Sequence, residues 1–232
     1  MVSGLTCPRY SPTKSYLPNI RKKSIPSLRK NSLPNHRKKC LTFADAPKNA
    51  NEEIPRDERT IYTGIRIAGQ WIDFEERLFL GGTVAMMVPS EFQEMDREIA
   101  KMKYPMERRP ETILTDYTGT INILFSNLGE PMSNEDAATI RNGMLKVMFR
   151  MNPGIKQQSR GEESVSGKNI AYAEFTNPAI DGKLHNLMFF LEVAGKATMI
   201  SFNCLTKSLK YWSKPAFEMM RSVKVIATPD EL

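Results

Sequence analysis

The stretch from Leu184 to Trp212 constrains the fold most, because it combines two strand-length apolar runs with a tight turn. The runs flank an Ala-Gly-Lys-Ala segment, and glycine takes a positive φ without steric cost, so we expect a hairpin whose two-residue loop is Gly195-Lys196. In its middle, from Leu187 to Leu191, the first run is apolar on both faces. A strand that avoids water on both sides lies inside a sheet with a layer on each face.

A short helix is expected before this hairpin. Asp96 can accept hydrogen bonds from the first free N–H groups of a helix that ends near Lys103. The spacing places Ile99 and Met102, or Lys103, on the inner side of that helix. Tyr104 precedes a proline and is therefore pushed out of the α region, which ends the helix.

Two further helices complete the expected layers. Ser133 and Asp136 fit a capping-box variant that opens the longest helix, which ends at about Met151. The last helix is expected to carry Pro215 in its first turn, where the missing N–H costs nothing. Runs of antiparallel strands broken by helices indicate the α+β class. We therefore predict an antiparallel six- or seven-stranded sheet with helices on both faces, a three-layer α/β/α sandwich.

The net charge of +7 is distributed unevenly along the chain. Residues 1–47 contain ten Lys or Arg and one acid, whereas residues 48–232 contain 23 basic and 25 acidic residues. The near-neutral second part does not fit a nucleic-acid-binding domain. The first part is rich in proline and poor in apolar groups, so it cannot offset its chain entropy by folding. We predict a disordered basic Pro/Ser-rich tail at 1–50, a linker and first strand at 51–77, and one α+β sandwich domain at 78–228.

Three roles are open for the basic tail. Its cations can contact anionic lipid or nucleic acid nonspecifically, and we expect any polyanion binding to be confined to the tail. It can instead be an organelle transit peptide, because it is rich in Arg and Ser and poor in acids, or an upstream extension with no selected role. No window reaches the roughly 18 apolar residues of an integral membrane span, and no secretory signal core is visible. The expected location is cytoplasmic, or an organelle if the tail is a transit peptide.

Cysteine and histidine supply one enzymatic alternative. The three cysteines are an odd number without close spacing, so neither a disulfide framework nor a metal site is predicted, and no cofactor is expected. With the loop at Gly195-Lys196, His185 and Cys204 lie on one face of the hairpin as diagonal neighbours. A working thiolate needs an electropositive, partly exposed site, which the sequence does not reveal. A buried structural Cys204 is therefore the main interpretation, and a thiol-dependent enzyme using Cys204 and His185 is the alternative.

Three asparagines form a second constellation. With the hairpin loop at Gly195-Lys196, the pairing of the two strands places Asn186 and Asn203 together on the face opposite His185. Asn122 is expected on another strand of the same sheet. Buried amides must find hydrogen-bond partners. We expect either a structural network that fixes the sheet or the polar floor of a binding groove.

A loop and the abundant methionines add to this candidate site. The segments Lys103-Tyr104-Pro105 and Arg108-Arg109-Pro110 place a phenol and two guanidinium groups in one loop, where they can bind carboxylates or aromatic anchors or stabilise the fold. Thirteen of the fourteen methionines follow residue 85, where they fill a core or line a surface that accepts varied hydrophobic partners. The candidate binding residues are Tyr104, Arg108, Arg109, Asn122, Asn186, Asn203 and Trp212.

Several short motifs occur between residues 78 and 225. They are Gly81-Gly-Thr-Val, Lys103-Tyr-Pro, Arg108-Arg-Pro, Gly119-Thr-Ile-Asn122, Asn186-Leu-Met-Phe-Phe-Leu191, and Phe202-Asn-Cys204 with Trp212. These motifs resemble those of a family of uncharacterised bacterial proteins, found largely in spore-forming Gram-positive bacteria. The family resembles in fold the photosystem II extrinsic proteins, the Mog-type Ran-binding import factors, DcrB-like proteins and Eag-type effector chaperones. The resemblance implies a habit of binding other proteins without catalysis; no catalytic residue is carried over.

The sequence therefore favours a non-enzymatic protein- or peptide-binding module, adaptor-like or chaperone-like, that uses a groove of methionine and aromatic side chains. A protein or peptide is the expected partner. The alternative is the thiol-dependent enzyme.

Overall fold

The computed structural model describes residues 59–105, 107, 109–179 and 182–226, so the expected tail and Arg108 lie outside the described residues. The α-helices in this part are α1 (Arg97–Lys103), α2 (Ala137–Met151) and α3 (Leu209–Arg221). The strands are β1 (Ile65–Ile67), β2 (Gln70–Ile72), β3 (Phe74–Phe79), β4 (Val84–Pro89), β5 (Gln93–Glu94), β6 (Thr112–Thr115), β7 (Ile121–Pro131), β8 (Lys156–Val165), β9 (Lys168–Ala179), β10 (Gly182–Val193), β11 (Lys196–Leu205) and β12 (Lys224–Val225).

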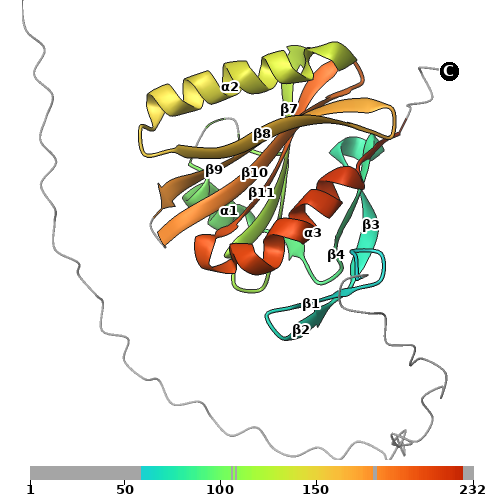
Figure 1. The fold of residues 1–232 in the computed structure, drawn as a ribbon, viewed down its shortest axis with the longest axis vertical. Helices are drawn as coiled ribbons and strands as arrows, with labels where there is room; N and C mark the ends of the chain where they lie inside the picture. The colour runs from blue at the N-terminus through green and yellow to red at the C-terminus, as the bar shows by residue number, and fades with distance from the viewer. Residues whose placement is uncertain (1–58, 106, 108, 180–181, 227–232) are drawn as a thin grey trace, which may run out of the picture. The chain divides into compact units, whose positions relative to one another are not determined.

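Seven of these strands form one antiparallel sheet in the order β5-β6-β7-β11-β10-β9-β8 (Figure 1). The central hairpin β10-β11 lies inside this sheet, as its two-sided apolar pattern predicted. Helices cover both faces, because α3 packs on one and α2 on the other. The predicted α+β class, the strand number and the layered arrangement are therefore confirmed.

The helix starts follow their sequence signals. The Asp96 carboxylate accepts hydrogen bonds from the N–H groups of Glu98 and Ile99 at the start of α1. Ser133 and Asp136 form the expected capping box on a short 3-10 turn that leads into α2. Both devices satisfy N–H groups that have no partner inside a helix.

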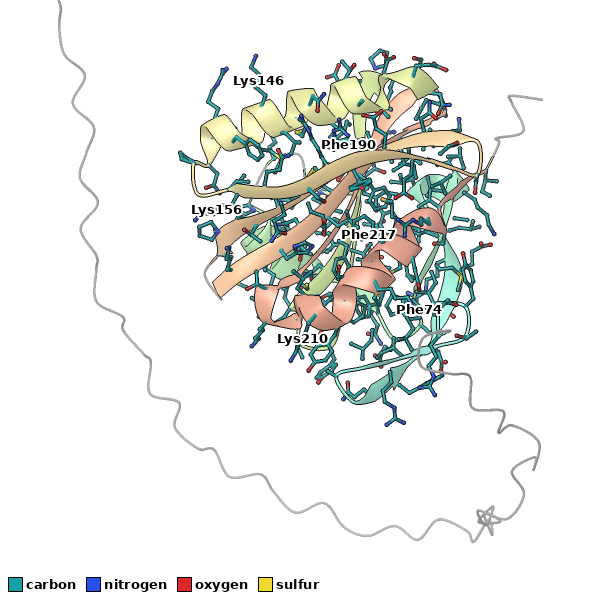
Figure 2. The ribbon with its side chains drawn as sticks, viewed as in Figure 1. Phe74, Lys146, Lys156, Phe190, Lys210 and Phe217 are labelled. Carbon is teal, nitrogen blue, oxygen red and sulfur yellow. The ribbon has the colours of Figure 1, made fainter. Side chains whose placement is uncertain are left out.

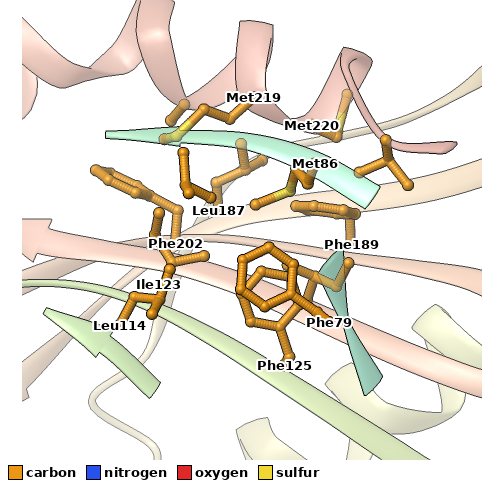
Figure 3. Close-up of a cluster of buried hydrophobic side chains, with 14 of the residues drawn as sticks. Phe79, Met86, Leu114, Ile123, Phe125, Leu187, Phe189, Phe202, Met219 and Met220 are labelled. Carbon is orange, nitrogen blue, oxygen red and sulfur yellow. The ribbon is translucent and has the colours of Figure 1, made fainter. Parts of the chain in front are cut away.

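The two faces of the large sheet are named here after their main helices. On the α3 face, α3 and a small sheet of order β12-β4-β3 enclose one continuous apolar core. Figure 3 shows part of this core, in which the rings of Phe79 and Phe125 stack with their centroids 3.9 Å apart. Met86, Met219 and Met220 close the same core, so these methionines fill the interior.

The small sheet was not expected. The sequence around residues 78–88 predicts two strands with a glycine kink, and β3 and β4 do flank a 3-10 turn at Leu80–Gly82. These strands pair with each other and with β12 instead of joining the large sheet. The segment before residue 78 contributes to the core as well, since Ile61, Ile67 and Ile72 are buried in it. Packing therefore begins earlier in the chain than the expected domain start at 78.

The hairpin register differs from the prediction by two residues. The loop is Ala194-Gly195, and both residues have positive φ, 50° and 72°. This is the backbone that a two-residue hairpin favours, and alanine adopts it here at a steric cost. Because the shift is even, no side chain changes face. His185 lies directly opposite Cys204 instead of diagonal to it.

The last helix begins before the expected position. Pro215 was predicted in its first turn, but α3 starts at Leu209 and Pro215 is its seventh residue. Burial of Trp212 against Phe92 and Phe202 explains the earlier start, because these contacts stabilise the first turns of α3 in a helix.

The long outer strand of the large sheet, β8, is polar along most of its length, and the polar sequence of this segment predicts an edge strand. Its pairing with β9 is interrupted by a register shift between Gln157 and Ser159. The buried Arg141 of α2 donates from Nη1 to the carbonyl oxygen of Gly161 at 2.8 Å.

Within the described part of the chain, no helix has the length and apolarity that a membrane span requires.

Candidate functional site

The three candidate asparagines lie in one row on the α2 face. Asn186 of β10 pairs with Asn203 of β11, which in turn pairs with Asn122 of β7. Asn122 Nδ2 donates to Asn203 Oδ1 at 2.9 Å. Asn186 Nδ2 instead donates to Asn177 Oδ1 at 2.7 Å, so the row consists of two hydrogen-bonded pairs. We call Asn122, Asn186, Asn203 and the neighbouring Ser201 the polar strip.

Tyr104 completes one end of the polar strip. Its hydroxyl is hydrogen-bonded to the Asn203 side chain, and burial raises the pKa of the phenol, an effect that this hydrogen bond partly offsets. The phenol therefore stays protonated at neutral pH and can donate. Its ring packs with Met95, Ile113 and Leu124. The structure thus brings Tyr104, Asn122 and Asn203 together at one end of the polar strip.

Two atoms of the polar strip have no hydrogen-bond partner in the described part of the chain. These are Asn122 Oδ1 and Ser201 Oγ, and both are buried. An unpaired buried polar atom costs about 1–3 kcal/mol, so such atoms are uncommon in native folds. Ser201 was not a sequence candidate, although its place two residues before Asn203 puts it on the same face of β11.

The polar strip separates two apolar clusters on the α2 face. One cluster packs beneath α2 around Leu145, Phe175 and Phe190. The other is small and lies by α1, around Ile113 and Leu124. The cover of this face is therefore divided, whereas the cover of the α3 face is continuous.

Helix α1 points its large apolar side chains outward, and only the small Ala100 packs toward the sheet. None of its seven residues is buried, and Ile99 and Met102 are 44% and 76% exposed, contrary to the predicted inner side. Lys103 Nζ donates to the carbonyl oxygen of Gly119, which holds α1 against the turn between β6 and β7. That turn carries Tyr117, which is 87% exposed. We call Ile99, Met102 and Tyr117 the α1 surface.

Tyr117 was not among the candidate residues predicted from the sequence, which included the aromatic and basic residues of only one loop. The segment Asp116-Tyr-Thr-Gly119 has the composition of a turn, so the aromatic side chain that it carries was a usable signal. Asp116 fixes the turn, since its Oδ1 accepts from the N–H groups of Thr120 and Ile121. A rigid turn presents an aromatic side chain with little loss of entropy on binding.

Arg109 lies in a separate cleft at the edge of the sheet. The cleft has a volume of about 490 Å³ and runs beside the end of β7. Its three carboxylates outnumber the single guanidinium group, so the cleft favours cationic over carboxylate ligands. The lining residues are Glu107, Arg109, Glu111, Asn127, Leu128, Gly129 and Glu130.

Trp212 is remote from the other candidates. It is buried on the α3 face between Phe92 and Phe202, with ring centroids 5.8 and 5.7 Å away. The polar strip lies on the opposite face of the sheet. Trp212 therefore stabilises the core and contributes nothing to the surface that carries Tyr104.

The alternative thiol pair lies in the interior of the α3 face. Cys204 is fully buried, and burial raises the pKa of its thiol to about 12. His185 Nδ1 lies 2.9 Å from Gln158 Oε1, and its Nε2 lies 3.4 Å from Glu174 Oε1. Burial lowers the pKa of His185, although Glu174 opposes the shift. These surroundings are the opposite of the electropositive, exposed site that activates a thiolate.

The residues that the structure describes contain no group of three His, Cys, Asp or Glu side chains placed to hold a metal ion. The hydrogen bonds of His185 serve the fold. The α1 surface and the Arg109 cleft can contact a partner through apolar contacts and charge, respectively, whereas most of the polar strip is buried.

Comparison with solved structures gives the fold a precedent. The cyanobacterial PsbP (CyanoP) from Synechocystis sp. PCC 6803 is similar over 66% of this chain and 92% of its own, with 10% identity and a TM-score of 0.50. LpqN, described as involved in cell envelope biogenesis of Mycobacterium tuberculosis, is similar over 73% and 98%, with 10% identity and a TM-score of 0.45. No protein-family model and no curated protein sequence matches the chain. The expected likeness in fold to a photosystem II extrinsic protein is confirmed by CyanoP.

Proposed function

We propose that this domain is a non-catalytic protein-binding module that recognises its partner through the α1 surface. The observation that carries the proposal is the outward direction of Ile99 and Met102 on a helix without one buried residue. Apolar side chains one turn apart, flanked by charged residues, are typical of a helix that docks a partner. Met102 adds flexibility, which suits partners of varied shape.

The polar strip supports this role from beneath. Tyr104 follows α1 directly and is held by Asn203, so the strip fixes the end of the helix that presents Met102. The likeness to the bacterial family, with its expected adaptor or chaperone habit, favours the same role. A thiol enzyme is disfavoured by the burial of Cys204.

Site-specific photocrosslinking in the full chain tests the proposal. A benzoylphenylalanine in place of Met102 or Tyr117 is expected to crosslink a specific protein. The matched control carries the same group in place of Tyr62, another exposed aromatic residue, and is expected to give at least tenfold less of that product. Met102→Asp should remove the product formed from position 117, because a carboxylate cannot enter an apolar contact without a desolvation cost.

Equal crosslinking from positions 62, 102 and 117 would contradict the proposal. So would a product at 117 that survives Met102→Asp.

A further inference from the structure

The charge balance of residues 48–232 conceals a local excess. From Ala137 to Gly161 the chain contains five basic residues and no acid, in a region that is otherwise richer in acids than in bases. This run includes all of α2 and the first half of β8. The expectation that cationic character belongs to the tail alone is therefore incomplete.

Four of the five cations are exposed. Arg141 is buried and pairs with Glu162, whereas Lys146, Arg150, Lys156 and Arg160 are exposed. None of these four forms an ion pair with a described residue. Their charge is therefore not neutralised within the part of the chain that the structure covers.

Two exposed apolar side chains lie among these cations. Val147 and Met151 are 51% and 80% exposed and follow Lys146 and Arg150 directly, so the four side chains share the last turns of α2. Only four residues separate Met151 from Lys156, which begins β8. Figure 2 shows Lys146 projecting outward from α2, with Lys156 at the same end of the sheet. Arg160 lies on the α2 face of β8, whereas the register places the side chain of Lys156 on the α3 face. We call Lys146, Val147, Arg150, Met151 and Arg160 the α2 patch.

We propose that the α2 patch docks on an anionic phospholipid surface. Unpaired cations attract the headgroups, and the side chains of Val147 and Met151 can enter the boundary between headgroups and acyl chains. The outer side of a helix projects from the domain, and neither of the two described clefts has α2 patch residues in its lining. A projecting cationic and apolar surface suits a flat membrane better than a peptide, which needs a groove or a strand edge.

Nucleic acid and acidic peptides would also attract the cations of the α2 patch. Their phosphate and carboxylate groups make no favourable contact with the exposed Val147 and Met151, whereas the acyl chains of a lipid surface do. The apolar part of the α2 patch therefore distinguishes a lipid surface from other polyanions.

Vesicle cosedimentation of the full chain provides the test. The vesicles contain phosphatidylcholine with 30 mol% phosphatidylserine, or phosphatidylcholine alone. Lys146→Gln with Arg150→Gln is expected to weaken binding to the anionic vesicles about thirtyfold, from the contribution of each cation near a charged surface. The matched control, Lys207→Gln with Lys210→Gln, removes the same charge elsewhere and should weaken binding less than threefold. Unchanged urea midpoints would show that both variants fold.

The apolar contact is tested with Met151→Ser. It is expected to weaken binding to the anionic vesicles about threefold or more and to leave retention on heparin unchanged, because heparin offers no apolar phase. Equal losses in the two double variants would overturn the α2 patch. A Met151→Ser variant with full vesicle binding would overturn the lipid assignment in favour of a general polyanion site.

This test uses no residue of the α1 surface. A negative result with vesicles would therefore contradict lipid binding by the α2 patch without bearing on protein binding by the α1 surface.

Discussion

On the α3 face of the sheet, one helix and a three-stranded sheet enclose a continuous apolar core, whereas on the α2 face two separate helices leave the polar strip between them. The difference arises within single strands. In β11, Phe202 and Cys204 point to the α3 face, and Ser201 and Asn203 to the α2 face. One sheet thus has a face with continuous apolar packing and a face on which buried polar groups divide the apolar packing.

Labelling with a thiol reagent tests most directly whether the core on the α3 face is closed to solvent. A thiol with a pKa of about 12 instead of 9.0 has about a thousandfold less thiolate at neutral pH. We expect Cys204 to resist iodoacetamide in the folded chain and to react in urea. Peptide mass spectrometry measures this site separately from Cys7 and Cys40. Rapid labelling in the folded state would show that the α3 face opens and would revive the enzymatic alternative.

Removing a ring from the same core should give the largest loss of stability. Phe125→Ala deletes a fully buried side chain and its stacking on Phe79. We expect the free energy of unfolding to fall by about 3–5 kcal/mol, measured by urea denaturation. Tyr117→Ala, an exposed control, should change it by less than about 0.5 kcal/mol. A loss below about 1 kcal/mol for Phe125→Ala would mean that the core is not continuous.

The α2 face should respond more weakly and unevenly. Asn203→Ala removes the acceptor of Asn122 Nδ2 and the partner of Tyr104, so we expect a loss of about 1–3 kcal/mol. Ser201→Ala removes a hydroxyl that has no partner in the described part of the chain, so stability should stay the same or rise slightly. The two unfolding curves test this directly. An equal loss in both variants would show that the Ser201 hydroxyl is bonded in solution.

The smallest expected effect is a pH dependence that comes from His185. Burial keeps its folded pKa below that of the unfolded chain, about 6.5, so the unfolded state binds the proton first. The stability from neutral His185 is complete above about pH 6.5 and is lost as the pH falls toward the folded pKa. Between pH 7.5 and 5.5 the parent chain should therefore lose more stability than His185→Gln. Parallel curves would contradict a buried neutral imidazole.

Local signals in the sequence predicted most of the fold. The caps at Asp96 and Ser133, the two-sided apolar pattern of β10 and the polar edge strand β8 were each readable from a few residues. The hairpin loop lies one residue earlier than predicted, because Ala194 takes a positive φ although it has a Cβ, a conformation that propensity assigns to glycine. The predicted start of the last helix at Pro215 was wrong for a related reason. The tertiary contacts of Trp212 outweighed the cost of a proline inside α3.

The candidate site was only partly predictable. Alternation along β10 and β11 placed Asn186 and Asn203 on one face correctly, because strand geometry is regular. The outward direction of Met102 was not predictable, since a helix of seven residues carries too few positions to define an inner stripe. The α2 patch was not predicted from the sequence, because a charge sum over the whole domain hides a local run of basic residues without acids.

The hydrogen bond from Arg141 to Gly161 affects whether molecules of this protein associate through the edge strand β8. A long outer strand with free backbone groups is a template on which a second chain can add and a ribbon can grow. The Arg141 guanidinium occupies one of those groups, and the register shift after Gln157 bends the strand away from a flat, extendable geometry. Together, this contact and the register shift disfavour the addition of a second chain along β8, and we expect their loss to appear first as aggregation of a chain that is still folded.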